Sequence, residues 1–226
     1  MILPASFFAQ PPLQLARALI GKIIRHRVGD QWLAARIIET EAYDRRDRGS
    51  HASLGYTEKR KALFMAPGTL YLYYARGKDS LNFSAEGDGN GVLIKSALPW
   101  SDSLSPASSL QQMQQLNPDS KGLPRPLTRL CSGQTLVCKS LGLTVREWDQ
   151  QSQHPQRLRV EDVGYTPVAL LQSVRLGIPP GRDEHLLWRL IDRAEARHCT
   201  QNPLTRPQLP CHEILPGQPL VVSEPE

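Results

Sequence analysis

Two acidic residues, separated by a single residue, stand at the end of a stretch that is predicted to be a β-strand. The stretch 32–40, WLAARIIET, is rich in strand-forming residues and continues through Glu41 to Tyr43. Because side chains alternate between the faces of a strand, Glu39, Glu41 and Tyr43 are expected to share one face. A carboxylate in this position, beside a basic loop, can act as a general base. For Glu39 the favoured interpretation is a simpler one, that it balances nearby arginines.

Aromatic residues form a second group of candidates. In the predicted strand at 69–75, Tyr71 and Tyr73 share one face and Tyr74 lies on the other, while His51 follows in the loop after the acidic residues. Aromatic side chains interleaved with basic ones offer surfaces on which bases stack. The alternative is that Tyr71 and Tyr73 are half-buried strand tyrosines, which is the more common situation for such residues.

Positive charge is concentrated in one part of the chain. The net charge is +5, but residues 1–80 hold 13 basic and 7 acidic side chains, and 20 of the 27 basic residues in the whole chain are arginine. Arginine pairs bidentately with phosphate, so this bias is typical of a nucleic-acid binder. Arg45, Arg46 and Arg48 lie in a polar loop expected over 44–61 and are predicted to contact a DNA backbone. The alternative is a solvated basic surface.

Composition excludes several classes of protein. With 226 residues, 40% hydrophobic residues and a mean hydropathy of −0.38, the chain is expected to be soluble and globular. No apolar run approaches the ~20 residues of a membrane span, and no secretory signal is predicted at the start. Four cysteines are too few for a disulfide scaffold at this length, so a cytoplasmic location is expected.

The common catalytic motifs are absent from the sequence. It contains no phosphate-binding Walker loop, no dinucleotide-binding fingerprint and no G-x-S-x-G nucleophile motif. The pairs His198-Cys199 and Cys211-His212 match no standard zinc spacing. We therefore predict no metal site, and chemistry that depends on carboxylates and aromatic rings becomes the leading interpretation.

The first half of the chain is predicted to be mostly β-structure. A helix is expected over about 13–20, followed by a hairpin of two strands, 22–28 and 32–40. Residues 77–79 are expected to form a further turn. Three more strands are expected between turn signals, at 69–75, 80–85 and 92–98.

The second half is predicted to be less regular. A short helix is expected over 109–116, and helix or turn over 127–141. Strands are expected within 165–176, and the leucine spacing predicts a helix over 186–196. Residues 203–226 contain six prolines and are expected to have little regular structure. No internal repeat and no linker between two cores is evident.

Several blocks of the sequence carry a family resemblance. Between about residues 13 and 191, and most strongly over 36–98, the chain resembles the alkyladenine (3-methyladenine) DNA glycosylase family. The blocks that carry it are IIETEAY, FMAPGTLYLYY, NFSAEGDGNGVLIKSALP, RLCSG and RLGI. The resemblance implies an α+β fold, a single mixed domain with a curved antiparallel β-sheet flanked by helices and a protruding β-hairpin that enters the DNA minor groove. We expect this domain over 1–202 and a proline-rich tail over 203–226.

The resemblance also implies an activity. A member of this family would be a monofunctional DNA glycosylase that flips alkylated or otherwise damaged purines out of the helix and hydrolyses their N-glycosylic bond in base-excision repair. It would need no cofactor, no metal and no lysine Schiff base. Its partner would be double-stranded DNA containing damaged purines, and it would act as a monomer. The range among alkylated, deaminated and etheno purines stays open.

Site residues follow from the same resemblance. Glu41, rather than Glu39, occupies the position of the general base. Tyr43 would cover one face of the flipped base, and His51 with Tyr73 the other.

Two further pocket positions and the hairpin complete the set. Asn82 matches the residue that clashes with the exocyclic amino group of guanine, and Lys95 stands where the family commonly has an arginine near the water. Arg76 aligns with the intercalating position, with Tyr74 two residues upstream, because the hairpin is one residue shorter here.

Two other interpretations remain open at this point. The first is a catalytically weak nucleic-acid-binding protein that keeps the glycosylase fold, which the departures at Lys95 and in the hairpin allow. The second is an unrelated hydrolase with a glutamate base, which explains Glu41 but not the basic first part of the chain. Retention of Glu41 favours the enzyme, because a binder has no need for an acidic group that faces phosphates.

Overall fold

One antiparallel sheet organises the whole chain. The computed structural model describes residues 1–225. The strands in this range are β1 (Ile23–Val28), β2 (Gln31–Tyr43), β3 (Leu70–Ala75), β4 (Lys78–Ser84), β5 (Gly91–Pro99), β6 (Leu158–Glu161), β7 (Leu170–Ser173), β8 (Arg189–Asp192) and β9 (Cys211–Ile214). The hairpin expected from 22–28 and 32–40 is confirmed as β1 and β2, and the three strands expected between 69 and 98 are confirmed as β3, β4 and β5.

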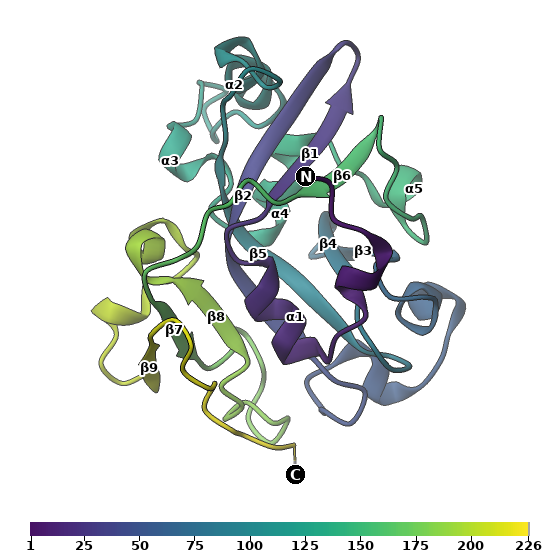
Figure 1. Ribbon diagram of the computed structural model, residues 1–226, viewed down its shortest axis with the longest axis vertical. Helices are drawn as coiled ribbons and strands as arrows, with labels where there is room; N and C mark the ends of the chain where they lie inside the picture. Colours follow the sequence, from purple (N-terminus) through teal and green to yellow (C-terminus); the bar gives the residue numbers. More distant parts are fainter. Residues whose placement is uncertain (226) are drawn as a thin grey trace.

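The strand order brings distant parts of the chain together. The main path of the sheet is β3-β4-β5-β2-β8-β7-β9, with β1 added to β2 and β6 added to β1 (Figure 1). Every strand pair is antiparallel. The long strand β2 lies at the centre and pairs with β1, β5 and β8. The α+β class with a curved antiparallel sheet flanked by helices is thus confirmed.

Short helices surround the sheet. The α-helices are α1 (Pro12–Leu19), α2 (Ala107–Leu116), α3 (Leu127–Leu130), α4 (Gln134–Leu141) and α5 (Val145–Trp148), and the 3₁₀ turns are η1 (Ala5–Phe8), η2 (His51–Leu54), η3 (Glu58–Phe64), η4 (Arg193–His198) and η5 (Pro203–Thr205). The loop expected over 44–61 therefore contains η2 and part of η3. None of the helices within residues 1–225 combines the length and the apolar character that crossing a lipid bilayer requires.

The two faces of β3, β4 and β5 have different surroundings. On one face Leu72, Phe83 and Val92 are buried in the main hydrophobic core, together with Phe8 and with Leu15 of α1. In Figure 1 this is the side from which the sheet is seen, with α1 in front of β5. On the other face alternate residues line a cavity, and these are Tyr71, Tyr73, Asn82, Leu93 and Lys95. Strand alternation thus separates the core from the cavity.

The segment 186–196 was expected to be helical, and this prediction is wrong. It forms strand β8, followed by the 3₁₀ turn η4. Leu186, Leu190 and Ile191 are fully buried, and all of β8 is buried between β2 and β7. The run LLWRLI over 186–191 is short and mostly apolar, and periodicity cannot distinguish such a run in a buried strand from one in a buried helix. The strands expected over 165–176 are limited to β7.

The segment after residue 202 is partly ordered by the sheet. The expectation of little regular structure is wrong for Cys211–Ile214, because β9 pairs with β7 at the sheet edge. Further along, Gln172 of β7 exchanges hydrogen bonds with the backbone of Val221 at 2.8 and 2.9 Å. The division of the chain into a domain at 1–202 and a tail at 203–226 stays a prediction.

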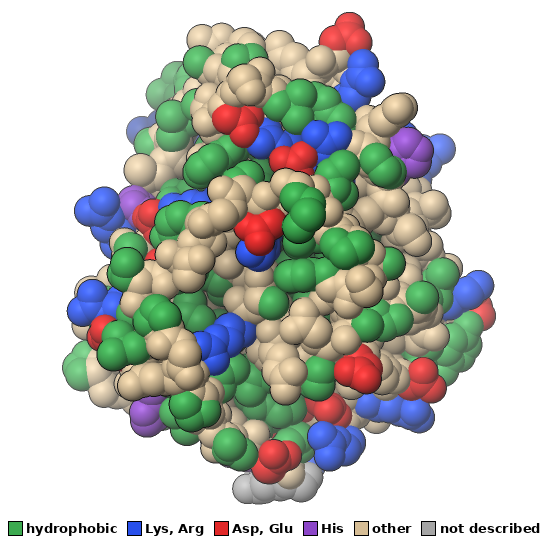
Figure 2. Space-filling view, viewed as in Figure 1, with side chains coloured by type: hydrophobic (Ala, Val, Ile, Leu, Met, Phe, Trp, Pro, Cys, Tyr) green, Lys and Arg blue, Asp and Glu red, His purple; other side chains and the backbone are tan. Residues whose placement is uncertain are grey.

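Charged side chains are mixed on the face that carries α1. Figure 2 shows basic side chains next to acidic ones at several places on this face, without a continuous basic area. One such pair joins Lys22 and Asp162, whose charged atoms lie 2.7 Å apart. The positive excess of residues 1–80 therefore forms no large patch here.

Candidate active site

One cavity collects the predicted pocket residues. It has a volume of about 320 Å³ and lies on the side of β3, β4 and β5 that faces away from α1. Tyr43, His51, Tyr73, Asn82 and Lys95 all line it, although they come from four strands and a 3₁₀ turn. A cavity of this size, with walls that combine aromatic and polar side chains, suits a small molecule or a single base.

The aromatic rings of the cavity support one another. The rings of His51 and Tyr73 meet edge to face with centroids 4.5 Å apart, and the ring of Tyr71 stacks on Tyr73 at 5.5 Å. Nδ1 of His51 lies 3.0 Å from the hydroxyl of Tyr71, which is only 4% exposed. Partial burial, with the charges of Arg60 and Arg182, lowers the pKa of His51, so the imidazole is neutral at pH 7.

Glu41 lies directly behind the cavity wall and is fully buried. Its Oε1 accepts a hydrogen bond from the Leu176 amide at 3.1 Å, and its Oε2 accepts one from the Tyr43 hydroxyl at 2.8 Å. The ammonium of Lys95 lies 3.3 Å from Oε1. Burial alone would raise the pKa of Glu41, but the charge of Lys95 and these hydrogen bonds outweigh it and hold the pKa below its usual value. The carboxylate is therefore ionised at neutral pH, as a general base must be.

Glu39 is engaged elsewhere, as the sequence interpretation favoured. It forms a fully buried ion pair with Arg189, whose Nε lies 2.6 Å from Oε1. Its other oxygen accepts hydrogen bonds from the Ser96 hydroxyl and from the Thr200 amide at 3.2 Å. The pairing of β2 with β5 shifts register on both sides of Glu39, and such bulges often lie beside active sites. Glu39 therefore balances an arginine, whereas Glu41 contacts Tyr43, Lys95 and Leu176, which line the cavity.

Arg175 is an important residue that the sequence interpretation missed. Its guanidinium lies 4.7 Å from the centroid of the Tyr43 ring and donates a hydrogen bond to the Ala42 carbonyl at 3.1 Å. It also forms a fully buried ion pair with Asp47. Since Leu176 follows it directly, Arg175 fixes both the ring of Tyr43 and the amide that binds Glu41. The block RLGI contains Arg175, but spacing gave no sign of its partner 128 residues away.

Asn82 and Gln134 supply polar groups to the cavity. Nδ2 of Asn82 donates to the Tyr71 carbonyl at 3.0 Å, which fixes the orientation of the carboxamide. Gln134, at the start of α4, donates from Nε2 to the Tyr73 hydroxyl at 3.3 Å. Gln134 was not predicted from the sequence, because the segment that contains it was expected only as helix or turn. The two carboxamides thus contact the Tyr71 carbonyl and the Tyr73 hydroxyl on the β3 side of the cavity.

The hairpin of β3 and β4 has a tighter turn than expected. Ala75 pairs with Lys78, so the turn consists of Arg76 and Gly77, with φ values of 52° and 75°. Two left-handed residues are typical of a type I′ hairpin turn. The turn expected at 77–79 therefore lies one residue earlier. Tyr74 is 61% exposed, and since Tyr73 lines the cavity, alternation directs Tyr74 to the opposite face.

The three arginines of the loop lie in different environments. The guanidinium of Arg45 lies 5.6 Å from the centroid of the Phe64 ring. Arg46 pairs with Asp44 at 3.0 Å and lines a separate cavity of about 850 Å³ beside α1, while Arg48 is exposed. The structure therefore does not bring Arg46 to the aromatic cavity. The role of the three arginines in contacting a DNA backbone stays a prediction.

The fold and the site together define a class of protein. An aromatic cavity with an ionised carboxylate behind its wall suits a protein that encloses a flat ring and activates a nucleophile beside it. A family model of methylpurine-DNA glycosylases matches residues 6–196. The chain belongs to this family.

Individual relatives agree with the family assignment. A protein of Pseudomonas savastanoi pv. phaseolicola, provisionally named a 3-methyladenine DNA glycosylase, is 61% identical over 213 residues, which cover 94% of this chain and 96% of the relative. A Pseudomonas aeruginosa protein of the same provisional name is 62% identical over 207 residues, covering 92% and 87%. The human DNA-3-methyladenine glycosylase is 35% identical over 153 residues, covering 64% and 49%.

Proposed function

We propose that this protein is a DNA glycosylase that releases alkylated purines from double-stranded DNA in base-excision repair. The observation that carries the proposal is the buried, ionised carboxylate of Glu41 directly behind an aromatic cavity of about 320 Å³. Family membership and the names of the relatives support it. The proposal includes action as a monomer in the cytoplasm and requires no cofactor.

In the proposed reaction, Tyr43 stacks on one face of the flipped purine, and His51 and Tyr73 on the other. An alkylated purine carries positive charge, so cation–π attraction to these rings favours it by ~0.5–2 kcal/mol. A water attacks C1′ of the sugar while the bond from C1′ to the purine nitrogen breaks. Glu41 takes the proton of the water, and the bonding electron pair leaves with the base. Lys95 keeps a positive charge beside the carboxylate, though without the planar fork of an arginine.

Incubation with methylated DNA tests the proposed function. The protein is expected to release 3-methyladenine as a free base and to leave abasic sites in the DNA. Tight binding to lesion DNA without any released base would instead support the alternative of a catalytically weak DNA-binding protein. Activity on hypoxanthine and ethenoadenine duplexes would then define the substrate range.

Asn82 is proposed to exclude guanine by a clash with its exocyclic amino group. Its carboxamide is 6% exposed and held by the Tyr71 carbonyl, so it cannot easily move aside. Asn82→Ala is expected to raise the ratio of released guanine lesions to released adenine lesions about tenfold. The reason is that a pocket discriminates one small group by ~1–3 kcal/mol. The measurement is the ratio of 7-methylguanine to 3-methyladenine released from one methylated sample, with Asn202→Ala as the control. An unchanged ratio would assign the selectivity to another part of the cavity.

Arg76 is proposed to fill the gap left by the flipped nucleotide. It occupies the tip of the hairpin, whereas Tyr74 is directed away from the cavity face, and a guanidinium stacks on bases. Arg76→Ala is expected to slow excision from duplex about tenfold more than from single strands, because holding a base flipped out of a stack costs a few kcal/mol. Tyr74→Ala on the same lesion is the comparison. Equal losses on both substrates would limit Arg76 to a phosphate contact, and no loss from either variant would refute the hairpin assignment.

A further inference from the structure

Two arginines at the aromatic cavity lack a carboxylate partner. Arg60 and Arg182 both line the cavity, and no acidic side chain within residues 1–225 lies within 4 Å of either guanidinium. The two fully buried arginines close to the cavity are neutralised, Arg175 by Asp47 and Arg189 by Glu39. An arginine that faces a cavity without a counterion is available to an anionic ligand.

Both guanidinium groups are anchored to the same loop. Nη1 of Arg60 donates to the Gly55 carbonyl at 3.1 Å, and Nε of Arg182 donates to the Arg48 carbonyl at 2.9 Å. These two carbonyls flank His51 in the chain, and the charges of both arginines act on the His51 ring. Each anchor occupies one N–H group and leaves other donors of the fork unused. The two charges are thus fixed relative to a ring that lines the cavity.

The remaining lining residues narrow the chemistry of the anion. Among residues 1–225 no Asp or Glu lines the cavity, and its walls include three aromatic side chains from Tyr43, Tyr71 and Tyr73. A ligand whose aromatic part fills the cavity and whose anionic part reaches Arg60 and Arg182 has the chemistry of a nucleotide. When a nucleotide is flipped out of DNA, its base enters the pocket while its two phosphodiester groups stay close to the sugar.

We propose that Arg60 and Arg182 bind the phosphodiester groups that flank the flipped nucleotide. This inference rests on the proposed function and adds the residues that hold the extrahelical backbone. The contact forms only after flipping, so it stabilises the flipped state rather than general binding to DNA. Arginine suits the role because its planar fork donates two parallel hydrogen bonds to a phosphate.

The test is a double-mutant cycle between arginine and phosphate. The probe is a duplex with one 3-deaza-3-methyladenine, a stable isostere of the alkylated base, in which a neutral methylphosphonate replaces the phosphate 5′ or 3′ of the lesion. The parent protein is expected to bind about tenfold more weakly when a contacted phosphate is neutralised. In Arg60→Gln or Arg182→Gln, neutralising the phosphate paired with that arginine is expected to cost less than twofold further. Arg60→Lys and Arg182→Lys, which keep the charge, should recover part of the binding.

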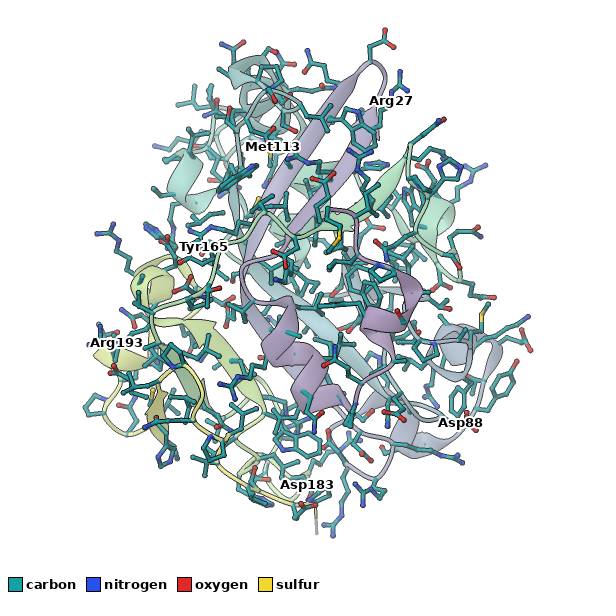
Figure 3. The ribbon with its side chains drawn as sticks, viewed as in Figure 1. Arg27, Asp88, Met113, Tyr165, Asp183 and Arg193 are labelled. Atoms are coloured by element: carbon teal, nitrogen blue, oxygen red, sulfur yellow. The ribbon has the colours of Figure 1, made fainter. Side chains whose placement is uncertain are left out.

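Arg27→Gln is the matched control. Arg27 is exposed and lies at the end of the molecule opposite to Asp183, the neighbour of Arg182 (Figure 3). This variant is expected to keep the full sensitivity of the parent to both methylphosphonates. Because Arg182 is exposed and Arg60 partly exposed, the glutamine variants are expected to melt within a few degrees of the parent.

Two results would overturn the inference. The first is that both glutamine variants keep the parent's sensitivity to the two methylphosphonates. The second is the same coupling on a duplex without a lesion, which would make the arginines general DNA contacts. Failure of the proposed function is distinguishable, because binding of the probe needs no catalysis. A protein that releases no base from methylated DNA can still show the coupling.

Discussion

Glu41→Gln is expected to abolish measurable base release while damaged-DNA binding stays within several-fold of the parent. The carboxylate is ionised and lies directly behind the cavity wall, and loss of a general base typically costs ~10²–10⁴ in rate. Removing a negative charge near DNA cannot weaken attraction to phosphates. The two effects therefore separate catalysis from binding in a single variant.

The measurement is single-turnover release of 3-methyladenine, combined with the affinity for a lesion duplex. Glutamine keeps one acceptor oxygen, which can serve the Leu176 amide, but its NH2 group cannot accept the hydrogen bond of the Tyr43 hydroxyl, so a stability loss of ~1–3 kcal/mol is expected. A thermal melt shows that the variant remains folded. The control is Glu86→Gln, an exposed carboxylate in the turn before β5, which is expected to leave the rate unchanged. A parental rate in Glu41→Gln would refute its assignment as the base.

One wall of the cavity could be predicted from the sequence because β3, β4 and β5 are neighbours in the chain, whereas the roles of the pocket residues came from the family resemblance. Strand alternation in β3 puts Tyr71 and Tyr73 on one face, and β3 pairs with β4 through a two-residue turn, which brings Asn82 opposite Tyr71. The next strand, β5, pairs with β4 and places Leu93 opposite Asn82. Regular pairing of neighbouring strands therefore fixes one wall of the cavity once the strands are known.

The buried ion pairs behind the cavity could not be predicted because they join residues far apart in the sequence. Arg175 pairs with Asp47 across 128 residues of the chain, and Arg189 pairs with Glu39 across 150. The sequence interpretation assigned β8 to a helix, so it had no basis for aligning Arg189 with Glu41, its cross-strand partner. Charge pairing between distant segments leaves no periodic signal, and only the closed sheet reveals which arginines remain unpaired.

Asp47→Ala is expected to lower the free energy of unfolding by ~3–5 kcal/mol, because it leaves the guanidinium of Arg175 buried without its counterion. Both side chains are fully buried, and the carboxylate also accepts a hydrogen bond from the Gly49 amide at 2.8 Å. For a chain of this length that loss corresponds to a fall in Tm of about 6–20 °C. The measurement is a thermal or urea melt of the parent and the variant.

Asp44→Ala is the control from the same loop. Asp44, 14% exposed, pairs with Arg46, whose side chain is 73% exposed, and an ion pair with its cation in solvent is worth ~0–1 kcal/mol. Its melt is therefore expected to stay close to the parent. Equal small losses in both variants would show that the Arg175 pair adds little to stability and that another contact holds Tyr43. A large loss at Asp47, with base release falling even well below the new Tm, would establish that this buried pair fixes both the ring that receives the base and the amide that binds Glu41.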